Sequence, residues 1–330
     1  MEKHDNIIVT GAAGFIGSNY VNDLVEQGYT NILVIDKLTY AGNLKNLKYK
    51  DKIKFEKVDI CDTTGNLEAI ITNFNASYVV HLISETHVDN SISCSAPFIR
   101  TNVMGTANLL DICRKLPNLK KFIHISTDEV YGYLKPTDTH KFNESTPYNP
   151  TSPYAASKAS SDMIVQSYIH THNFPAIITN CSNNYSINQH PEKLIPKIIT
   201  NCFLGNDIPI YGNGLNVRDW MHVMDHCSAI NHLIKHGTIG QTYCIGSNID
   251  REITNLEITN IICEEVSKIT GKDHTKQIKF VEDRKGHDFK YAVDCSKLVA
   301  LGWLPKYTDI RQGLIDTINH YHNELINNNK

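Results

Sequence analysis

The stretch TGAAGFIG, residues 10–17, decides the fold that we predict for this chain. It follows a short apolar run, Ile7 to Thr10, and opens a segment with helical spacing, Phe15 to Gln27. Its three glycines allow a tight turn and let a phosphate group approach the free N–H groups at a helix N-terminus. A glycine triplet alone is weak evidence, because many are ordinary turns, but the strand–turn–helix context indicates a dinucleotide cradle.

Apolar strands alternate with amphipathic helices over the first two-thirds of the chain. This pattern predicts an α/β fold, a doubly wound parallel (Rossmann) sheet with helices on both faces. After about Asn184 the alternation stops and prolines punctuate short segments. We expect a dinucleotide-binding domain at 1–184, with 218–240 returning to it, and a smaller C-terminal α/β substrate-binding lobe at 185–330. The expected strands are 7–10, 32–35, 55–58, 78–82, 122–125 and 176–179, and the expected helices are 15–27, 67–74, 98–115, 154–171, 256–269 and 309–325.

Composition excludes several classes of protein. The 330 residues carry a net charge of −3, so nothing indicates a nucleic-acid or membrane-surface partner. No apolar run approaches the roughly 20 residues of a membrane span, and the N-terminus lacks the order of a signal peptide. We therefore expect a cytoplasmic location. The nine cysteines are scattered without a CxxC pair, which argues against disulfides and against a metal site.

Asp36 ends the second expected strand, nineteen residues after Gly17. A carboxylate at this position accepts hydrogen bonds from the adenosine ribose hydroxyls and repels a 2′-phosphate. It therefore favours NAD over NADP as the cofactor. The alternative is an ordinary turn residue.

Tyr154 and Lys158 stand four residues apart at the start of a long helix, so they share one helical face. A phenol is a poor base at neutral pH, but a neighbouring ammonium and a positive nicotinamide ring favour the phenolate. Tyr154 can then take a hydroxyl proton while hydride leaves the same carbon. The alternative is a solvated helix surface, since YxxxK pairs arise by chance.

Thr127, Asp128 and Glu129 follow the fifth expected strand, at the edge where ligands bind to a parallel sheet. Like charges so close resist joint ionisation, so one of the two carboxyls should stay protonated. An acid beside a base suits elimination of water, in which one group removes a carbon-bound proton and the other protonates a leaving hydroxyl. The alternative is a pair of exposed loop carboxylates.

Together these motifs resemble the dTDP-glucose and UDP-glucose 4,6-dehydratases, which are extended short-chain dehydrogenases, over nearly the whole chain. Their combination is more specific than any one of them. The stretches that carry the resemblance are TGAAGFIG (10–17), DKLTYAGNL (36–44), ETHVDNSI (85–92), STDEVYG (126–132), SPYAASKASSD (152–162), CSNNY (181–185), PEKLIP (191–196), RDW (218–220), TNLE (254–257) and DRKGHD (283–288).

The resemblance implies a reaction in which NAD takes hydride from C4 of the glucosyl group and returns it to C6. Tyr154 would deprotonate O4 and Thr127 would hydrogen-bond it. Glu129 would remove the C5 proton, and Asp128 would protonate the departing C6 hydroxyl. The product would be a 4-keto-6-deoxy sugar nucleotide.

The resemblance also implies which residues hold the two ligands. Arg218 would bind the diphosphate, unless it forms a structural salt bridge, for example with Asp219. The cofactor residues would be Gly11, Gly14, Phe15, Ile16, Gly17, Asp36, Lys37, Asp59, Ile60, Leu82, Ser84, Thr101, Ser126, Tyr154, Lys158 and Asn184. The substrate residues would be Thr86, His87, Thr127, Asn183, Lys193, Leu194, Pro209, Tyr211, Arg218, Asn255 and His287.

At three positions the sequence differs from the bacterial dTDP-glucose enzymes, so it does not decide whether the nucleoside base of the substrate is thymine or uracil. Asn90 stands where an arginine is common and resembles the UDP-glucose enzymes, and residues 186–188 replace a Gly-Pro-aromatic stretch. The loop at 248–253 looks longer than usual, which leaves a helix N-cap as the alternative role of Asn255.

The same motifs are compatible with two other functions, and two of the expected helices suggest a homodimer. A nucleotide-sugar 4-epimerase or decarboxylase would share everything except the paired carboxyls, and a non-catalytic NAD-sensing protein would have no need of the Tyr–Lys pair. The helices at 98–115 and 154–171 resemble the pair that forms a homodimer interface in this family. Apolar spacing at Val103, Ala107, Leu110, Met163, Ile164 and Ser167 is compatible with a homodimer, and the alternative is ordinary core.

Overall fold

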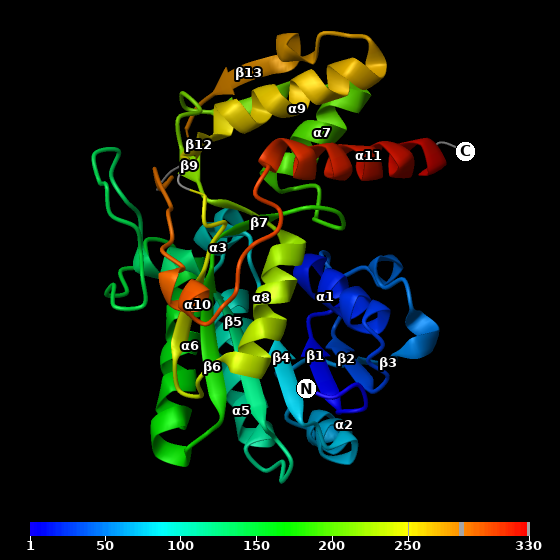
Figure 1. Ribbon diagram of the computed structural model, residues 1–330, viewed down its shortest axis with the longest axis vertical. Helices are drawn as coiled ribbons and strands as arrows, with labels where there is room; N and C mark the ends of the chain where they lie inside the picture. Colours follow the sequence, from blue (N-terminus) through cyan, green and yellow to red (C-terminus); the bar gives the residue numbers. More distant parts are fainter. Residues whose placement is uncertain (250, 284–286, 329–330) are drawn as a thin grey trace.

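The computed structural model describes residues 1–249, 251–283 and 287–328, and its centre is a parallel sheet. In these residues the sheet has seven strands, in the order β11-β6-β5-β4-β1-β2-β3 (Figure 1). This confirms the doubly wound α/β fold predicted from the sequence. The strands are β1 (Ile7–Thr10), β2 (Ile32–Asp36), β3 (Lys54–Lys57), β4 (Tyr78–His81), β5 (Lys121–Thr127), β6 (Ala176–Cys181) and β11 (Thr242–Ile245).

Strand β11 is an addition to the expected set. It pairs in parallel with β6, and three of its four residues are buried. It lies just beyond the 218–240 stretch that we expected to return to the sheet. A four-residue strand carries little periodicity of its own, which is why the sequence did not reveal it. The division of the chain at residue 184 stays a prediction.

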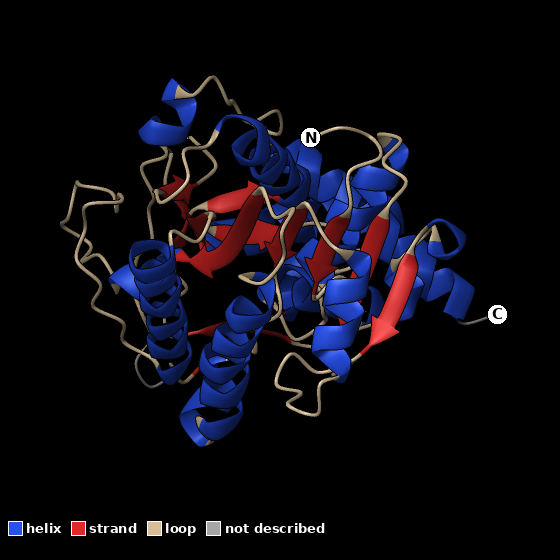
Figure 2. Ribbon diagram, turned by 90° about the horizontal axis from the view of Figure 1, so that it is seen from below, coloured by secondary structure: helices blue, strands red, loops and turns tan. Residues whose placement is uncertain are grey.

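Helices cover both faces of the sheet (Figure 2). Alternate strand residues face opposite sides, so Ile7 and Val9 join one apolar cluster and Ile8 joins the other. The first cluster contains residues of α1 (Phe15–Glu26), α8 (Val223–His236) and α10 (Ser296–Ala300). The second contains residues of α2 (Asn66–Phe74), α5 (Thr106–Cys113) and α6 (Pro153–His172).

Strand order reverses between β1 and β4, and ligands of doubly wound sheets bind at such a switch point. Gly11 follows β1 there with a φ of +73°, which favours glycine. A Cβ on Gly11 would lie 2.8 Å from the backbone nitrogen of Ile83, which follows β4. The two strand ends therefore approach so closely that only glycine fits between them.

The helix expected at 98–115 is interrupted by a π-helical segment. The chain runs through α4 (Ala96–Phe98), the π-helical η3 (Ile99–Gly105) and α5. Asn102 in η3 accepts from the backbone N–H of Glu85 at 2.8 Å and donates to Ser157 Oγ at 2.8 Å. π-Segments are often found at functional sites, and this one brings Thr101 to the wall of the first cavity described below.

A second group of helices lies beyond the carboxyl edge of the sheet, at the top of Figure 1. Its apolar core contains Ile198 of α7 (Leu194–Leu204), Ile262 of α9 (Asn255–Thr270) and Leu314 of α11 (Ile310–Asn328). Its strand pairs are β7 (Asn183–Tyr185) with β10 (Trp220–His222), β8 (Ile208–Tyr211) with β13 (Ile278–Val281), and β9 (Val217–Arg218) with β12 (Ile253–Thr254). Among the described residues, no helix is long and apolar enough to cross a membrane.

The N-cap of α9 is Thr254, whose Oγ1 accepts from the backbone N–H of Glu257 at 3.1 Å. The alternative that made Asn255 the cap is therefore wrong, because Asn255 is already the first helical residue. The sequence TNLE contains two residues that favour caps, and only the backbone shows which one lies outside the helix.

Replacing Thr254 by alanine should destabilise the protein by about 1 kcal/mol, because the helix loses a side-chain acceptor for one free N–H group. Urea unfolding followed by circular dichroism would measure the change. Asn255→Ala is the matched control and should cost less. Equal losses from both substitutions would contradict the capping assignment.

Candidate active site

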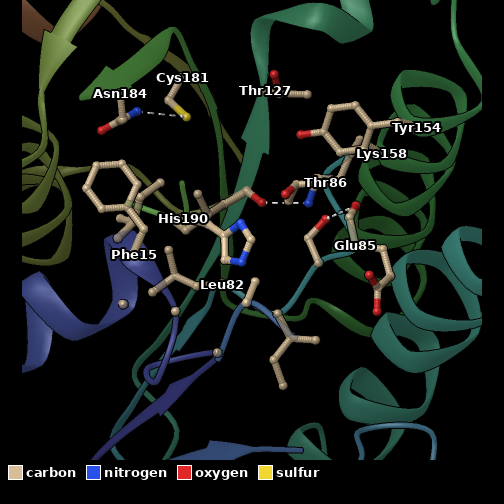
Figure 3. A pocket seen from close by; sticks show the side chains of 18 of the residues that line it. Phe15, Leu82, Glu85, Thr86, Thr127, Tyr154, Lys158, Cys181, Asn184 and His190 are labelled. Atoms are coloured by element: carbon tan, nitrogen blue, oxygen red, sulfur yellow. Dashed lines mark hydrogen bonds between the residues drawn. The ribbon is translucent and has the colours of Figure 1, made fainter. Parts of the chain in front are cut away.

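A cavity of about 300 Å³ lies at the switch point, over the glycine loop (Figure 3). The loop after β1, the ends of β4, β5 and β6, and the start of α6 contribute to its wall. In Figure 3 the Tyr154 ring and Thr127 lie on one side of this space and Phe15 lies on the other. The volume is at the lower end of the range typical of small-molecule sites.

The glycine loop fits a dinucleotide phosphate. A Cβ on Gly17 would lie 2.5 Å from the carbonyl oxygen of Gly11, so the loop and the first helical turn could not pack so tightly with any larger residue. Asp36 closes the loop, because its carboxylate accepts from the N–H groups of Ala13 at 3.0 Å and Leu38 at 2.8 Å. Burial raises the pKa of Asp36 above its usual range, although both hydrogen bonds oppose that rise.

Fourteen of the sixteen cofactor candidates line this cavity, and Asp59 and Ile60 do not. Asp59 lies 3.8 Å from the ammonium of Lys37, which also bonds Thr101 Oγ1 at 3.1 Å. Ile60 is fully buried, and its side chain lies where a Cβ of Gly105 would be. Both residues follow β3, and we had assigned them to the cofactor site because they follow a strand end. That position alone does not bring a residue to the cavity.

The Thr127-Asp128-Glu129 triplet turns sharply at the end of β5. Thr127 Oγ1 accepts from the backbone N–H of Glu129 at 3.3 Å and so caps the 3₁₀ turn η4 (Asp128–Tyr131). Asp128 is 1% exposed, and its Oδ1 accepts from Thr127 Oγ1 at 3.3 Å. Its Oδ2 is buried without a hydrogen-bond partner. The triplet thus directs an unpaired carboxyl oxygen into the protein interior beside the cavity.

Burial raises the pKa values of both Asp128 and Glu129, but by different amounts. Desolvation, together with the charge of Glu129, raises the pKa of Asp128 well above its usual range, which favours its protonated form. Desolvation also raises the pKa of Glu129, to about 7, while the positive charges of Lys193 and Arg218 restrain the rise. These shifts support the expectation of an acid beside a base, and the roles of the two residues stay predictions.

Tyr154 and Lys158 lie on the first two turns of α6, whose N-terminus is capped by Ser152. Lys158 Nζ donates to the carbonyl oxygen of Ile125 at 2.7 Å. Burial raises the pKa of the Tyr154 phenol well above 10, Glu129 adds to the rise, and a hydrogen bond with Thr127 opposes it. The expectation that Lys158, together with the nicotinamide, favours the phenolate stays a prediction, and in the protein alone burial dominates the pKa of the phenol.

A second cavity of about 200 Å³ adjoins the first. Glu129 lines both, so the triplet stands at their junction. Nine of the eleven substrate candidates line the second cavity: Thr86, His87, Asn183, Lys193, Leu194, Tyr211, Arg218, Asn255 and His287. Thr127 lines the first cavity, and Pro209 lines neither. Pro209 is in β8 and half-buried, next to Ile210, which does line the second cavity.

Arg218 points its guanidinium along the wall of the second cavity. It donates to the carbonyl oxygens of Val217 at 2.7 Å and Asp288 at 2.9 Å, and it lies 4.5 Å from the ring centre of Tyr291. Asp219 instead accepts from the N–H of Ser247 at 3.2 Å. The suggested Arg218–Asp219 salt bridge is therefore wrong, and neutral carbonyls leave the positive charge available to an anion.

Two buried acceptors on the cavity walls support the fit of a polar ligand. Asn183 Oδ1 and Asn255 Oδ1 are buried without a hydrogen-bond partner, and such atoms are rare in native proteins. Opposite them, His287 Nδ1 lies 2.6 Å from Asp283 Oδ1. Residues 284–286 of the DRKGHD stretch and Asp250 of the longer loop lie outside the described residues.

Several wall residues were not among the candidates. The first cavity also contains a loop that follows β2, which lies in the quoted DKLTYAGNL motif, and a stretch before α7, of which only Glu192 lies in a quoted motif. Gln189, His190 and Tyr291 belong to no quoted motif, and no sequence signal marks them. The unassigned residues are Thr39, Ala41, Gly42, Glu85, Ile125, Cys181, Ser182, Gln189, His190 and Glu192 in the first cavity, and Val88, Asp89, Ser152, Trp220, Asp288 and Tyr291 in the second.

The described residues contain no candidate metal site. Across residues 1–249, 251–283 and 287–328, no group of three or more His, Cys, Asp or Glu side chains could hold a metal ion. All nine cysteines fall in these ranges and are free thiols.

The sheet, the glycine loop and the Tyr–Lys pair define an extended short-chain dehydrogenase. The GDP-mannose 4,6 dehydratase family model matches residues 8–317. A dTDP-glucose 4,6-dehydratase of Neisseria gonorrhoeae is 43% identical, with 97% of this chain and 96% of that protein covered. The corresponding enzyme of Mycolicibacterium smegmatis is 44% identical, with 96% and 92% covered.

Solved structures agree with the sequence relatives. A dTDP-glucose 4,6-dehydratase from Streptomyces venezuelae, solved with NAD bound, has a TM-score of 0.89 and 39% identity, with 96% of this chain and 97% of that chain covered. A UDP-glucose 4-epimerase from Thermotoga maritima has a TM-score of 0.87 but 29% identity, with 97% and 99% covered. This chain belongs to the dTDP-glucose 4,6-dehydratase family, as the sequence analysis predicted.

The raised pKa of Glu129 has a cost in stability that depends on pH. Because the folded-state pKa, about 7, lies above the ordinary 4.5, the folded protein resists ionisation of this carboxyl. The cost is absent below pH 4.5, grows as the pH rises, and is complete above about pH 7. Glu129→Gln should therefore raise the melting temperature at pH 8.5 by about 2 °C or more, and change it little at pH 4.5.

Differential scanning fluorimetry at the two pH values would measure this difference. Glu282→Gln, at an exposed carboxyl, is the control and should show no such pH dependence. An equal effect of Glu129→Gln at both pH values would show that the carboxyl ionises freely in the folded protein.

Proposed function

We propose that this chain is an NAD-dependent 4,6-dehydratase that converts dTDP-glucose to the 4-keto-6-deoxy-glucose nucleotide and water. The observation that carries the proposal is the pair of adjacent carboxyls, Asp128 buried and Glu129 half-buried, at the junction of the two cavities. Burial raises the pKa of Asp128 well above its usual range and that of Glu129 to about 7. An epimerase needs no such pair, because it only removes and returns hydride at one carbon.

When bound, NAD supplies the hydride acceptor for C4, the hydride donor for C6 and the positive charge that favours the Tyr154 phenolate. Tyr154 takes the proton of the sugar O4, and Thr127 hydrogen-bonds that oxygen. Oxidation makes the C5 hydrogen acidic, since it then lies next to a carbonyl, and Glu129 removes it. Asp128 gives its proton to O6 as water leaves, and Glu129 returns its proton to C5 when hydride reaches C6. The raised pKa of Asp128 suits an acid, and the pKa of Glu129, about 7, suits a base.

The two cavities support a division between cofactor and substrate. Asp36 and the glycine loop suit NAD in the first cavity. Arg218 and Lys193 in the second suit a diphosphate, and the unpaired oxygens of Asn183 and Asn255 suit donors of a base or a sugar. The relatives at 43–44% identity favour thymine as the base over the uracil to which Asn90 gave a weak hint.

The proposal is tested with purified protein and dTDP-glucose, UDP-glucose and UDP-N-acetylglucosamine. Mass spectrometry should show loss of one water, with the highest kcat/KM for dTDP-glucose. An epimerised sugar of unchanged mass would contradict the dehydratase, and NAD binding without turnover of any of the three would favour a sensing protein.

Two variants should stop the reaction at different points. Glu129→Gln should oxidise C4 and accumulate NADH, seen at 340 nm, because C5 then has no base. Tyr154→Phe should block oxidation itself, with a rate at least about 10²-fold lower and no NADH. Full dehydration by Glu129→Gln would overturn its assigned role.

We also propose a homodimer. Residues of α3 (Val88–Ser93), η3 and α6 expose large apolar side chains although these helices contact one another: Ile92 is 51% exposed, Ile99 50%, Met104 63% and Met163 57%. Of the residues that suggested this interface from the sequence, Met163 is exposed and can contact a partner. Leu110 cannot, because it is wholly buried in the core of its own chain. The cytoplasmic location stays a prediction.

Light scattering should give twice the mass of one chain, and the double substitution Met104→Glu/Met163→Glu should give a monomer, because charge on an apolar interface opposes association. Ile239→Glu alters an exposed apolar residue elsewhere and should leave the dimer intact. A monomeric wild type, or dissociation by Ile239→Glu alone, would contradict the proposed interface.

A further inference from the structure

Asp162 is a buried carboxylate that the reaction described above does not use. It lies on α6, four residues beyond Lys158, with a side chain that is wholly inaccessible to solvent. Its Oδ2 accepts from Ser126 Oγ at 2.8 Å, Tyr148 OH at 3.0 Å and Asn180 Nδ2 at 3.2 Å. Three donors to one oxygen are an arrangement that suits a carboxylate, which only accepts hydrogen bonds.

The fourth contact of Asp162 is His124, whose Nε2 lies 3.1 Å from Oδ1. His124 Nε2 also lies 3.2 Å from Ser161 Oγ, but that hydroxyl already donates to the carbonyl oxygen of Lys158 at 2.7 Å. The proton is therefore on Nε2, and neutral His124 donates it. Burial lowers the pKa of His124, which keeps the ring neutral.

Three of these donors, His124, Ser126 and Asn180, come from the strands that end at the active site. Ser126 directly precedes Thr127 on β5. Asn180 on β6 also approaches the carbonyl oxygen of Thr127 at 3.3 Å, and its Oδ1 accepts from Tyr131 of η4 at 3.0 Å. Asp162 therefore connects the helix that carries Tyr154 and Lys158 to the strand that carries the triplet.

Asp162 is also the counter-charge of Lys158. The Lys158 side chain is buried, which lowers its pKa, and Asp162 is the main charge that opposes this effect. The other titratable groups facing Lys158 are neutral near pH 7. Burial raises the pKa of the Cys181 thiol and the Tyr154 phenol, and burial lowers the pKa of His124 on β5 and His81 on β4.

We propose that Asp162 is a positioning residue, which keeps Lys158 protonated and fixes the Thr127 turn against α6 through Ser126 and Asn180. The proposal rests on the function proposed above, because both groups that Asp162 holds act in the oxidation of C4. Asp162 touches neither cavity and is therefore not a catalytic residue.

The test is Asp162→Asn, which keeps the shape and removes the charge. Lys158 should then lose its proton at lower pH, so the alkaline limb of the kcat profile should move down by at least about one pH unit. At pH 8 kcat should fall about tenfold or more, with KM changed less than about twofold. Tyr148→Phe removes one donor but leaves the carboxylate, so its pH profile should keep the wild-type position.

A stability cycle gives a second readout that needs no substrate. Asp162→Asn leaves the Lys158 ammonium buried without its partner, which is destabilising, whereas Asp162→Asn/Lys158→Met removes both charges. The double variant should be more stable than Asp162→Asn alone, and should fold even if Asp162→Asn does not.

A double variant as unstable as Asp162→Asn, or an active Asp162→Asn with the wild-type pH profile, would overturn the role of Asp162. Failure of the wild type to dehydrate any nucleotide sugar would instead overturn the proposed function. The stability cycle would still decide whether Asp162 and Lys158 are coupled.

Discussion

Burial of both faces of a parallel sheet is the constraint on which the rest of this structure depends. Every residue of β1, β2, β4 and β6 is buried, so polar groups on these strands need internal partners. Thr10 Oγ1 and His81 Nδ1 meet at 2.8 Å, and Asn180 bonds Asp162. Groups that must reach a ligand can leave the sheet only at its carboxyl edge, where the glycine loop and the Thr127 turn lie.

The same burial sets the chemistry of the site. Desolvation raises the pKa of Asp128 well above its usual range and that of Glu129 to about 7, because burial withdraws water that would stabilise each charge. Arg218 and Lys193 restrain the shift of Glu129, so a pair of cations suited to a diphosphate also tunes the base. Asp162, one turn along α6 from Lys158, lies in a different environment, because hydrogen-bond donors of β5 and β6 surround it. In the proposed mechanism two carboxyls transfer protons, and Asp162 supports the residues around them.

The parallel sheet and the glycine loop could be predicted from the sequence, because hydrophobic periodicity and glycine geometry depend on residues close together in the chain. The TGAAGFIG cradle, the alternation of strands and helices and the Tyr154–Lys158 pair required no knowledge of distant contacts. The comparisons with known proteins confirm the family and the fold. The assignments of individual site residues stay predictions, which the arrangement of the two cavities supports.

What the sequence missed depends on contacts between distant segments. Strand β11 is too short to show a period, and the π-helical turn depends on how Asn102 packs against Glu85 and Ser157. Asp59 and Ile60 follow a strand end but do not line the cavity, because Ile60 packs against Gly105 and Asp59 lies behind Lys37, at 3.8 Å from its ammonium. The pKa of the Tyr154 phenol also depends on burial by distant segments, which the sequence does not show.

The central claim is that hydride leaves C4 and returns to C6 around an elimination of water. The most direct test uses dTDP-glucose carrying deuterium at C4, with the product examined by NMR and mass spectrometry. The account predicts a product lighter by one water, with the deuterium on C6 of a 4-keto sugar. A product of unchanged mass that keeps the deuterium at C4 would contradict it.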